Sequence, residues 1–90
     1  MTNPISSEEV EHSIREYLLA EFLLGEDPQA LTASTPLISG GILDSIGVTR
    51  LITHLESTYS VRFESEEINV ENLDTIPSIV SAVMYKLQDA

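Results

Sequence analysis

An aspartate, a serine and a histidine near the middle of the chain are the residues whose types could do catalytic chemistry. Asp44, Ser45 and His54 match an orienting acid, a nucleophile and a general base. The surrounding pattern predicts one helix, on which the nine positions from Ser45 to His54 correspond to a rise of roughly 13 Å. Because a nucleophile and its base must lie within hydrogen-bond reach, the sequence argues against a catalytic triad and against an enzyme.

Ser45 alone suits a different chemistry, because it stands where this helix is predicted to begin. Gly40 and Gly41 precede it, and they predict only a tight turn, because the lysine and further glycines of a phosphate-binding loop are missing. Helix N-termini expose N–H donors and positive partial charge, so a phosphate esterified to Ser45 would be well tolerated. The local pattern leaves open the alternative that Ser45 is an ordinary helix cap.

The sequence contains no recognisable set of metal ligands. Cysteine is absent, which excludes disulfides, cysteine zinc sites and a thiol nucleophile. His12 and His54 belong to different predicted helices. One acidic group could attract a divalent cation loosely, but its order does not match a calcium loop, so we expect a solvated acidic face and no metal. Its members are Glu64, Glu66, Glu67, Glu71 and Asp74.

Length and charge limit the architecture and the partners. With 90 residues, 42% of them hydrophobic, the chain suits one domain spanning 1–90 with its core at about 6–88. A formal net charge of -11 disfavours nucleic acid and membranes and favours basic patches on other proteins, although it could serve solubility alone. The chain lacks a long apolar run and the regions of a signal peptide, which predicts a cytoplasmic location, and we expect a monomer.

Three stretches of helical periodicity position these residues. The first begins at a capping box of Ser6 and Glu9 and is expected to stop at Gly25. The second begins at Asp44 or Ser45, and the last begins at 74–75 with a proline in its first turn. Their apolar stripes are Val10, Ile14, Tyr17, Leu18 and Phe22; Val48, Leu51, Ile52, Leu55 and Tyr59; and Ile76, Ile79, Val80, Val83 and Leu87.

Two weaker segments connect these helices. Residues 25–43 contain repeated prolines and glycines, which predict a long loop. Residues 65–68 predict one helical turn, with Ile68, Val70 and Leu73 facing inward. The whole pattern predicts an all-α fold, a small antiparallel four-helix bundle with three longer helices and one short helix. The expected anchors of the long loop are Leu31, Leu37, Ile38, Ile42 and Leu43.

The segment Gly41-Ile42-Leu43-Asp44-Ser45-Ile46 resembles the attachment motif of acyl and peptidyl carrier proteins, and the resemblance continues to Glu71-Asn72-Leu73-Asp74-Thr75-Ile76 before the last helix. It implies that a phosphopantetheinyl transferase moves a 4'-phosphopantetheine arm from coenzyme A onto Ser45, with Asp44 supporting the cation used in the transfer. The arm's thiol would hold an acyl or aminoacyl group as a thioester. The other implied partners are an acyl- or aminoacyl-loading ligase and a downstream synthase or transferase.

The resemblance also assigns partner recognition to the second helix. The candidate docking residues are Ile46, Thr49, Arg50 and Thr53. Fatty-acid carriers usually have acidic residues where this chain has Gly47 and Arg50, which argues against a housekeeping fatty-acid role. The resemblance therefore implies a specialised biosynthetic pathway of polyketide, nonribosomal peptide, fatty acid or amino-acid-loading type. The alternative function is a non-enzymatic acidic helical interaction module in which Ser45 is only a helix cap.

Overall fold

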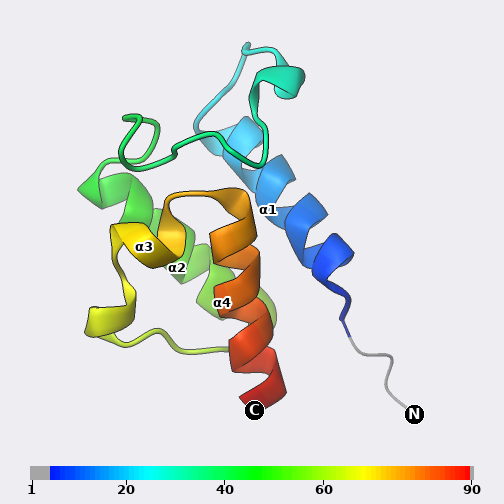
Figure 1. The fold of residues 1–90 in the computed structure, drawn as a ribbon, viewed down its shortest axis with the longest axis vertical. Coiled ribbons are helices and arrows are strands. Elements are labelled where there is room, and N and C mark those ends of the chain that lie inside the picture. Colours follow the sequence, from blue (N-terminus) through cyan, green and yellow to red (C-terminus); the bar gives the residue numbers. More distant parts are fainter. Residues whose placement is uncertain (1–4, 90) are drawn as a thin grey trace.

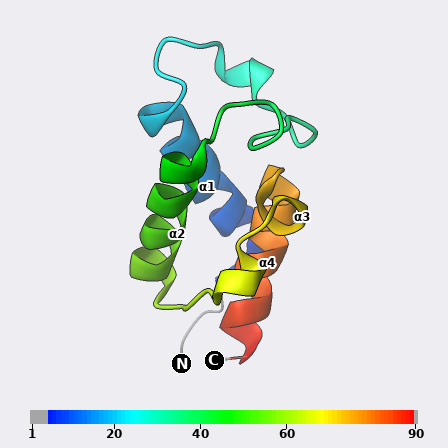
Figure 2. The same ribbon diagram turned by 90° about the vertical axis from the view of Figure 1, so that its left-hand side faces the viewer.

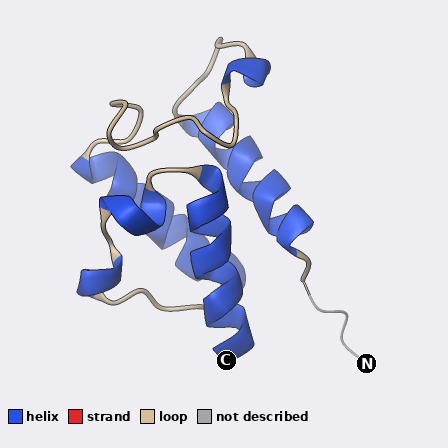
Figure 3. Ribbon diagram, viewed as in Figure 1, coloured by secondary structure: helices blue, strands red, loops and turns tan. Residues whose placement is uncertain are grey.

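The structure is a computed structural model that describes residues 5–89, and all of the regular secondary structure in this range is helical, with no strand (Figure 3). Three helices are long and one is a single turn, so the predicted fold class is confirmed. Two short 3-10 helices, η1 and η2, lie in the connections. The elements are α1 (Ser7–Glu21), η1 (Pro28–Ala30), α2 (Ser45–Tyr59), η2 (Ser65–Glu67), α3 (Val70–Leu73) and α4 (Ile76–Asp89).

The three long helices form a small bundle in which α1 runs opposite to α2 and α4 (Figures 1 and 2). α1 packs against α4, and α3 packs against α4 as well. The long loop between α1 and α2 crosses the end of the bundle where α1 ends and where α2 and α4 begin (Figure 2). This topology brings the loop, the N-terminus of α2 and the α3–α4 junction to the same end of the molecule.

Helix α1 begins where the capping box predicts it. The Ser6 side chain accepts from the Glu9 N–H and the Ser6 N–H donates to Glu9 Oε1, both at 3.1 Å. The expected stop at Gly25 is wrong, because α1 ends at Glu21 and Phe22 is its C-cap. The chain leaves the helix at Phe22 because this ring packs against Gly47 in the first turn of α2, where a Cβ would lie 3.1 Å from the ring.

The core is apolar and includes three anchors from the long loop. Leu31, Leu37 and Leu43 are buried as predicted, while Ile38 and Ile42 are partly buried against the same cluster. The predicted stripes of α1, α2 and α4 supply most of the remainder. The buried cluster consists of Val10, Ile14, Leu18, Leu31, Leu37, Leu43, Leu51, Ile52, Leu55, Leu73, Ile76, Ile79 and Val83.

The prediction for the short helix is only partly right. Leu73 is buried, but Ile68 and Val70 are 37% and 48% exposed. A 3-10 turn ends at Glu67, and the Asn69 side chain then accepts from the Asn72 N–H and starts α3 as a new helix. The helical phase therefore restarts after the turn, so Ile68 does not share the inward face of Leu73, while Val70 lies at the exposed first position of α3.

Within residues 5–89, none of the helices has both the length and the apolar content needed to cross a bilayer.

Ser60 ends α2 in a left-handed conformation, with φ 57° and ψ 43°. A side chain in this region costs roughly 1–2 kcal/mol, and glycine avoids the cost but loses more entropy on folding. We expect Ser60→Gly to raise the free energy of unfolding by about 0.5–1 kcal/mol. The matched control, Ser57→Gly inside α2, should lower it by about 0.5 kcal/mol. Urea denaturation at pH 7 measures both, and a loss of stability in both variants would contradict the prediction.

Candidate functional site

The N-terminus of α2 presents Ser45 to solvent. Asp44 is the N-cap, and its Oδ1 accepts from the Gly47 N–H at 2.7 Å. Ser45 is the first helical residue and is exposed. The capping role therefore belongs to Asp44, and a role for Ser45 as only the helix cap is wrong. The Ser45 hydroxyl is not used to hold the helix end and is accessible for chemistry.

The first turn of α2 suits a phosphate group. The first N–H groups of a helix have no intrahelical acceptor, and Asp44 satisfies only that of Gly47. The N–H groups of Ser45 and Ile46 therefore point out of the helix end, together with the positive end of its dipole. No acidic residue occupies the first turn. An anionic ester at Ser45 would meet favourable electrostatics, while the Asp44 carboxylate beside it could hold a cation.

Two glycines shape the chain around Ser45. Gly41 has φ +86°, a conformation that L side chains rarely adopt, and it makes the turn that leads back to the buried Leu43. At Gly47, a Cβ would lie 3.1 Å from Phe22 Cε1 and 3.3 Å from Asp44 Oδ1. The end of α1 thus packs directly beneath the first turn of α2, which fixes this turn relative to α1.

The predicted docking residues lie on the exposed flank of α2, as expected. Ile46 is 70% exposed, and Thr49, Arg50 and Thr53 are exposed too. The Thr49 hydroxyl donates to the Ser45 carbonyl at 3.0 Å. A shallow hollow of about 420 Å³ lies along this flank; it is lined by Thr49, Arg50, Thr53, Tyr17, His54 and Ser57.

Arg50 is tied to α1. Its guanidinium donates to Glu21 Oε1 at 2.5 Å and lies 5.0 Å from the centre of the Phe22 ring. Both partners are at the end of α1, so this contact joins the two helices beside Ser45. Because the pair is exposed, it contributes at most about 1 kcal/mol. Glu21 therefore already neutralises part of the positive charge of Arg50 before any partner protein binds.

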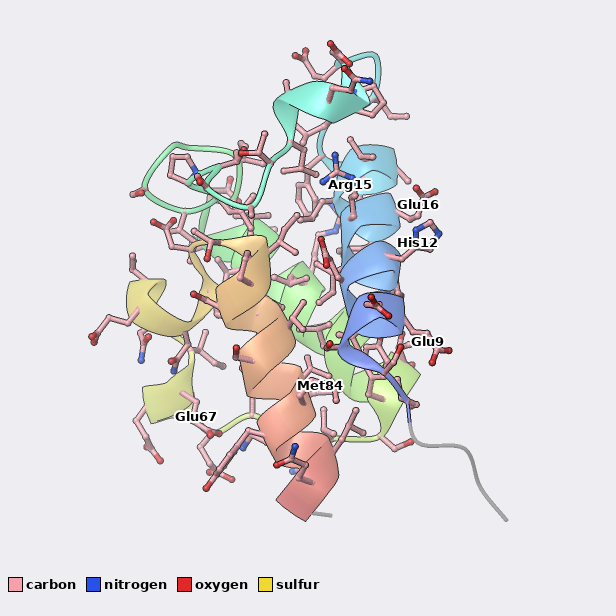
Figure 4. The ribbon with its side chains drawn as sticks, turned by 45° about the vertical axis from the view of Figure 1, so that its right-hand side comes forward. Glu9, His12, Arg15, Glu16, Glu67 and Met84 are labelled. Carbon is pink, nitrogen blue, oxygen red and sulfur yellow. The ribbon has the colours of Figure 1, made fainter. Side chains whose placement is uncertain are left out.

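The two histidines are far from a shared site. His54 stacks on Tyr17 with ring centres 4.0 Å apart, and burial lowers the pKa of His54, although Glu21 opposes this. Its Nε2 is buried without a partner. His12 lies on the outer face of α1 and points away from the bundle (Figure 4). Over residues 5–89, no three histidine, aspartate or glutamate side chains are grouped so that they could hold a metal ion.

The expected solvated acidic face is only partly present. Glu64, Glu66 and Glu71 are exposed. Glu67, which lies at η2 beside the lower half of α4 (Figure 4), accepts from Lys86 Nζ at 2.6 Å, and this hydrogen bond lowers the pKa of Glu67. The face is thus interrupted by an ion pair that joins η2 to α4.

Asp74 has a role that the sequence did not reveal. Its Oδ1 accepts from the Ile38 N–H at 2.7 Å and from the Ser39 N–H at 2.8 Å, and its Oδ2 accepts from the Ser39 hydroxyl at 2.7 Å. Of the two residues expected to cap α4, Asp74 and Thr75, it is Thr75 whose hydroxyl accepts from the Ser78 N–H at 3.3 Å. Asp74 therefore clamps the long loop to the α3–α4 junction. No local spacing signals a contact between residues 35 positions apart.

Comparison with known proteins identifies the kind of site. The family described as "Phosphopantetheine attachment site" matches residues 18–83. Similar curated proteins are the D-alanyl carrier proteins of Streptococcus pyogenes serotype M5 (strain Manfredo), serotype M49 (strain NZ131) and serotype M1. Each is 36% identical over 47 residues, which is 52% of this chain. The chain spans 60% of the length of these relatives.

The Asp74 clamp predicts a specific acid sensitivity. Hydrogen bonds from the Ser39 N–H and hydroxyl, and then from the Ile38 N–H, hold the pKa of Asp74 below its ordinary value of 3.8. A depressed pKa gives stability that is fully present above pH 3.8 and is lost as the pH falls through the lower, folded value. We therefore expect wild type to be more stable than Asp74→Asn from pH 7 to 5. This difference in stability should disappear as the pH falls below 3.8, the ordinary pKa of an aspartate.

Thermal unfolding of wild type and Asp74→Asn between pH 7 and pH 2 measures the difference in stability between them. Glu67 also has a depressed pKa, but it is present in both proteins, so its contribution cancels in the difference. Glu67→Gln serves as the matched control, because in this variant the Asp74 contribution is untouched. A stability gap between wild type and Asp74→Asn that stays constant down to pH 2 would show that the Asp74 carboxylate is not the cause.

Proposed function

The chain belongs to the family of phosphopantetheine attachment sites, and from this premise we propose that Ser45 is the residue that takes up the arm. The cofactor of the family is covalently attached 4'-phosphopantetheine, and the protein is a carrier, not an enzyme. When bound, the arm supplies a thiol that holds the cargo as a thioester. The observation that carries the assignment to Ser45 is its position as the exposed first residue of α2.

The other polar side chains of the neighbourhood support this choice. The Ser39 hydroxyl is taken up by Asp74, and the Thr49 hydroxyl is bonded to a helical carbonyl. Of these three side chains, only that of Ser45 combines exposure with the start of a long helix, where an anionic ester is stabilised by the dipole and by N–H groups. The requirement for a phosphoester is thus met at Ser45 and not at Ser39 or Thr49.

Each residue at the helix end has a proposed part in arm transfer. The Ser45 oxygen would form a new bond to the phosphorus that bears the pantetheine, the pyrophosphate bond of coenzyme A would break to release adenosine 3',5'-bisphosphate, and the serine proton would leave to the transferase. Asp44 is held beside Ser45 by its bond to the Gly47 N–H. From there its carboxylate can bind the cation that neutralises the phosphates. Ile46 offers an exposed apolar contact next to the reacting hydroxyl.

We propose that the cargo is an aminoacyl group. The support is the likeness to proteins named D-alanyl carrier proteins, together with Gly47 and Arg50 of α2, which stand where fatty-acid carriers usually have acidic residues. The proposed partners are a phosphopantetheinyl transferase, an aminoacyl-loading ligase and a downstream transferase or synthase. They would contact the flank of Ile46, Thr49, Arg50 and Thr53. The alternative interaction module loses its main support, because Asp44 and not Ser45 caps the helix.

Arm transfer tests the assignment of Ser45. Incubation with coenzyme A, magnesium and a promiscuous phosphopantetheinyl transferase should add one arm to the wild type, as measured by intact mass, and none to Ser45→Ala. Asp44→Asn should fold with nearly unchanged stability, because asparagine caps helices as well as aspartate does. It should nevertheless be modified about tenfold or more slowly, because one cation ligand has lost its charge.

Modification of Ser45→Ala would move the attachment point to another residue. An unmodified wild type under conditions in which a known carrier domain is modified would refute the proposed function. A fast Asp44→Asn variant would leave Asp44 with a capping role only.

Mass spectrometry of the carrier taken from the cells that naturally produce it tests the proposed cargo. We expect a nitrogen-containing aminoacyl group on the arm, released by hydroxylamine because it is a thioester, and absent from Ser45→Ala. An arm loaded only with fatty or polyketide acyl groups would contradict the aminoacyl proposal while leaving the attachment site intact.

A further inference from the structure

The segment that leads into the site is closed into a ring. The Leu43 N–H donates to the Leu37 carbonyl at 2.8 Å, so residues 37–43 turn back on themselves. The two leucines are buried and hold the neck of this ring in the core. Asp44 and Ser45 follow the neck directly. The path of residues 37–43 therefore determines where the cap and the first residue of α2 lie.

In the outer part of the ring, Ile38 and Ile42 are only partly buried against the core. Gly40 and Gly41 form its tip and are exposed, and the tip is held by the Gly41 N–H bond to the Ile38 carbonyl at 3.1 Å and by the close approach of Gly40 to Pro36. The α3–α4 junction adds a further attachment. Asp74 binds the N–H groups of Ile38 and Ser39 and the Ser39 hydroxyl, at 2.7 to 2.8 Å.

The backbone of the same residue strengthens this attachment. The carbonyl of Asp74 accepts from the Leu37 N–H at 2.6 Å. Three consecutive N–H groups, from Leu37 to Ser39, thus end on one residue, and both carboxylate oxygens are in use. Hydrogen bonds to a charged carboxylate are about twice as strong as neutral ones. The Asp74 side chain, which lies outside the attachment motif, therefore holds the loop segment that leads into this motif.

We propose that Asp74 is a positioning residue for arm attachment, because its carboxylate holds residues 37–43 in the shape in which a transferase can engage Ser45. This inference rests on the proposed role of Ser45 and adds a determinant outside the α2 motif. Asp74 does not touch the reacting atoms. It acts through Ser39 and the ring, so breaking the clamp leaves the Ser45 hydroxyl and the Asp44 cap in place but lets the preceding chain move.

The experiment compares arm transfer with local and global stability in four variants. Asp74→Asn keeps the side-chain shape but loses the charge and one acceptor, and Ser39→Ala removes the bond to Oδ2. Ser39→Thr keeps a hydroxyl and is the conservative rescue. Ile79→Val weakens the core, where Ile79 is fully buried, without touching the clamp.

For each protein, kcat/KM of arm transfer from coenzyme A, the melting temperature and hydrogen exchange of the amides of residues 37–43 are measured. Breaking the clamp should lower kcat/KM about tenfold in Asp74→Asn, less in Ser39→Ala, because misplacing a reacting group is costly. The Leu43 amide, which does not bind Asp74, should exchange faster in both. Ser39→Thr should restore the rate. Ile79→Val should lower the melting temperature and leave kcat/KM unchanged.

Three results would overturn the inference. The first is wild-type kcat/KM in Asp74→Asn despite faster exchange of the ring. The second is an equal loss of kcat/KM in Ile79→Val, which would make the effect one of stability alone. The third is unchanged hydrogen exchange in Asp74→Asn, which would refute the clamp. If the wild type itself accepted no arm, the proposed function would fail, and hydrogen exchange would still decide whether Asp74 holds the loop.

Discussion

The structure depends on keeping a long irregular segment in one conformation at the end of a small bundle. Such a segment has no helical ladder to satisfy its backbone, so each polar group needs another partner. Its Leu31, Leu37 and Leu43 side chains are buried in the core, and the Asp74 carboxylate accepts from two of its N–H groups, those of Ile38 and Ser39. Core packing and one charged acceptor together replace regular secondary structure. This arrangement therefore determines the position of the N-terminus of α2, where Ser45 lies.

Much of this could be read from the sequence, because local rules govern the helices. The capping box of Ser6 and Glu9 starts α1 as predicted, and the stripe through Leu51 and Leu55 is buried in α2. The exposed flank beside Ser45 follows from the same periodicity. These features depend on neighbours at most four positions apart along the chain. The family resemblance in the motif around Ser45 agrees with the match over residues 18–83.

The remainder depends on partners that are distant in sequence. Gly25 has the residue type and the positive φ of a helix stop, yet the packing of Phe22 on Gly47 ends α1 earlier. The Arg50–Glu21 pair joins residues 29 positions apart. Asp74 looked like a helix cap or part of an acidic face, and only the folded loop brings Ser39 to it. Periodicity has no access to such contacts, because the tertiary structure creates them.

The chain has only four lysine and arginine residues, and three of them serve as internal ties. Arg15 donates to the Pro28 carbonyl at 2.7 Å and points toward the loop (Figure 4), Arg50 binds Glu21, and Lys86 binds Glu67. Most carboxylates therefore face solvent without a basic side chain beside them to neutralise their negative charge. Added salt should weaken encounters with a basic partner while relieving the mutual repulsion of these carboxylates within the fold. Ionic strength would thus move association and compactness in opposite directions.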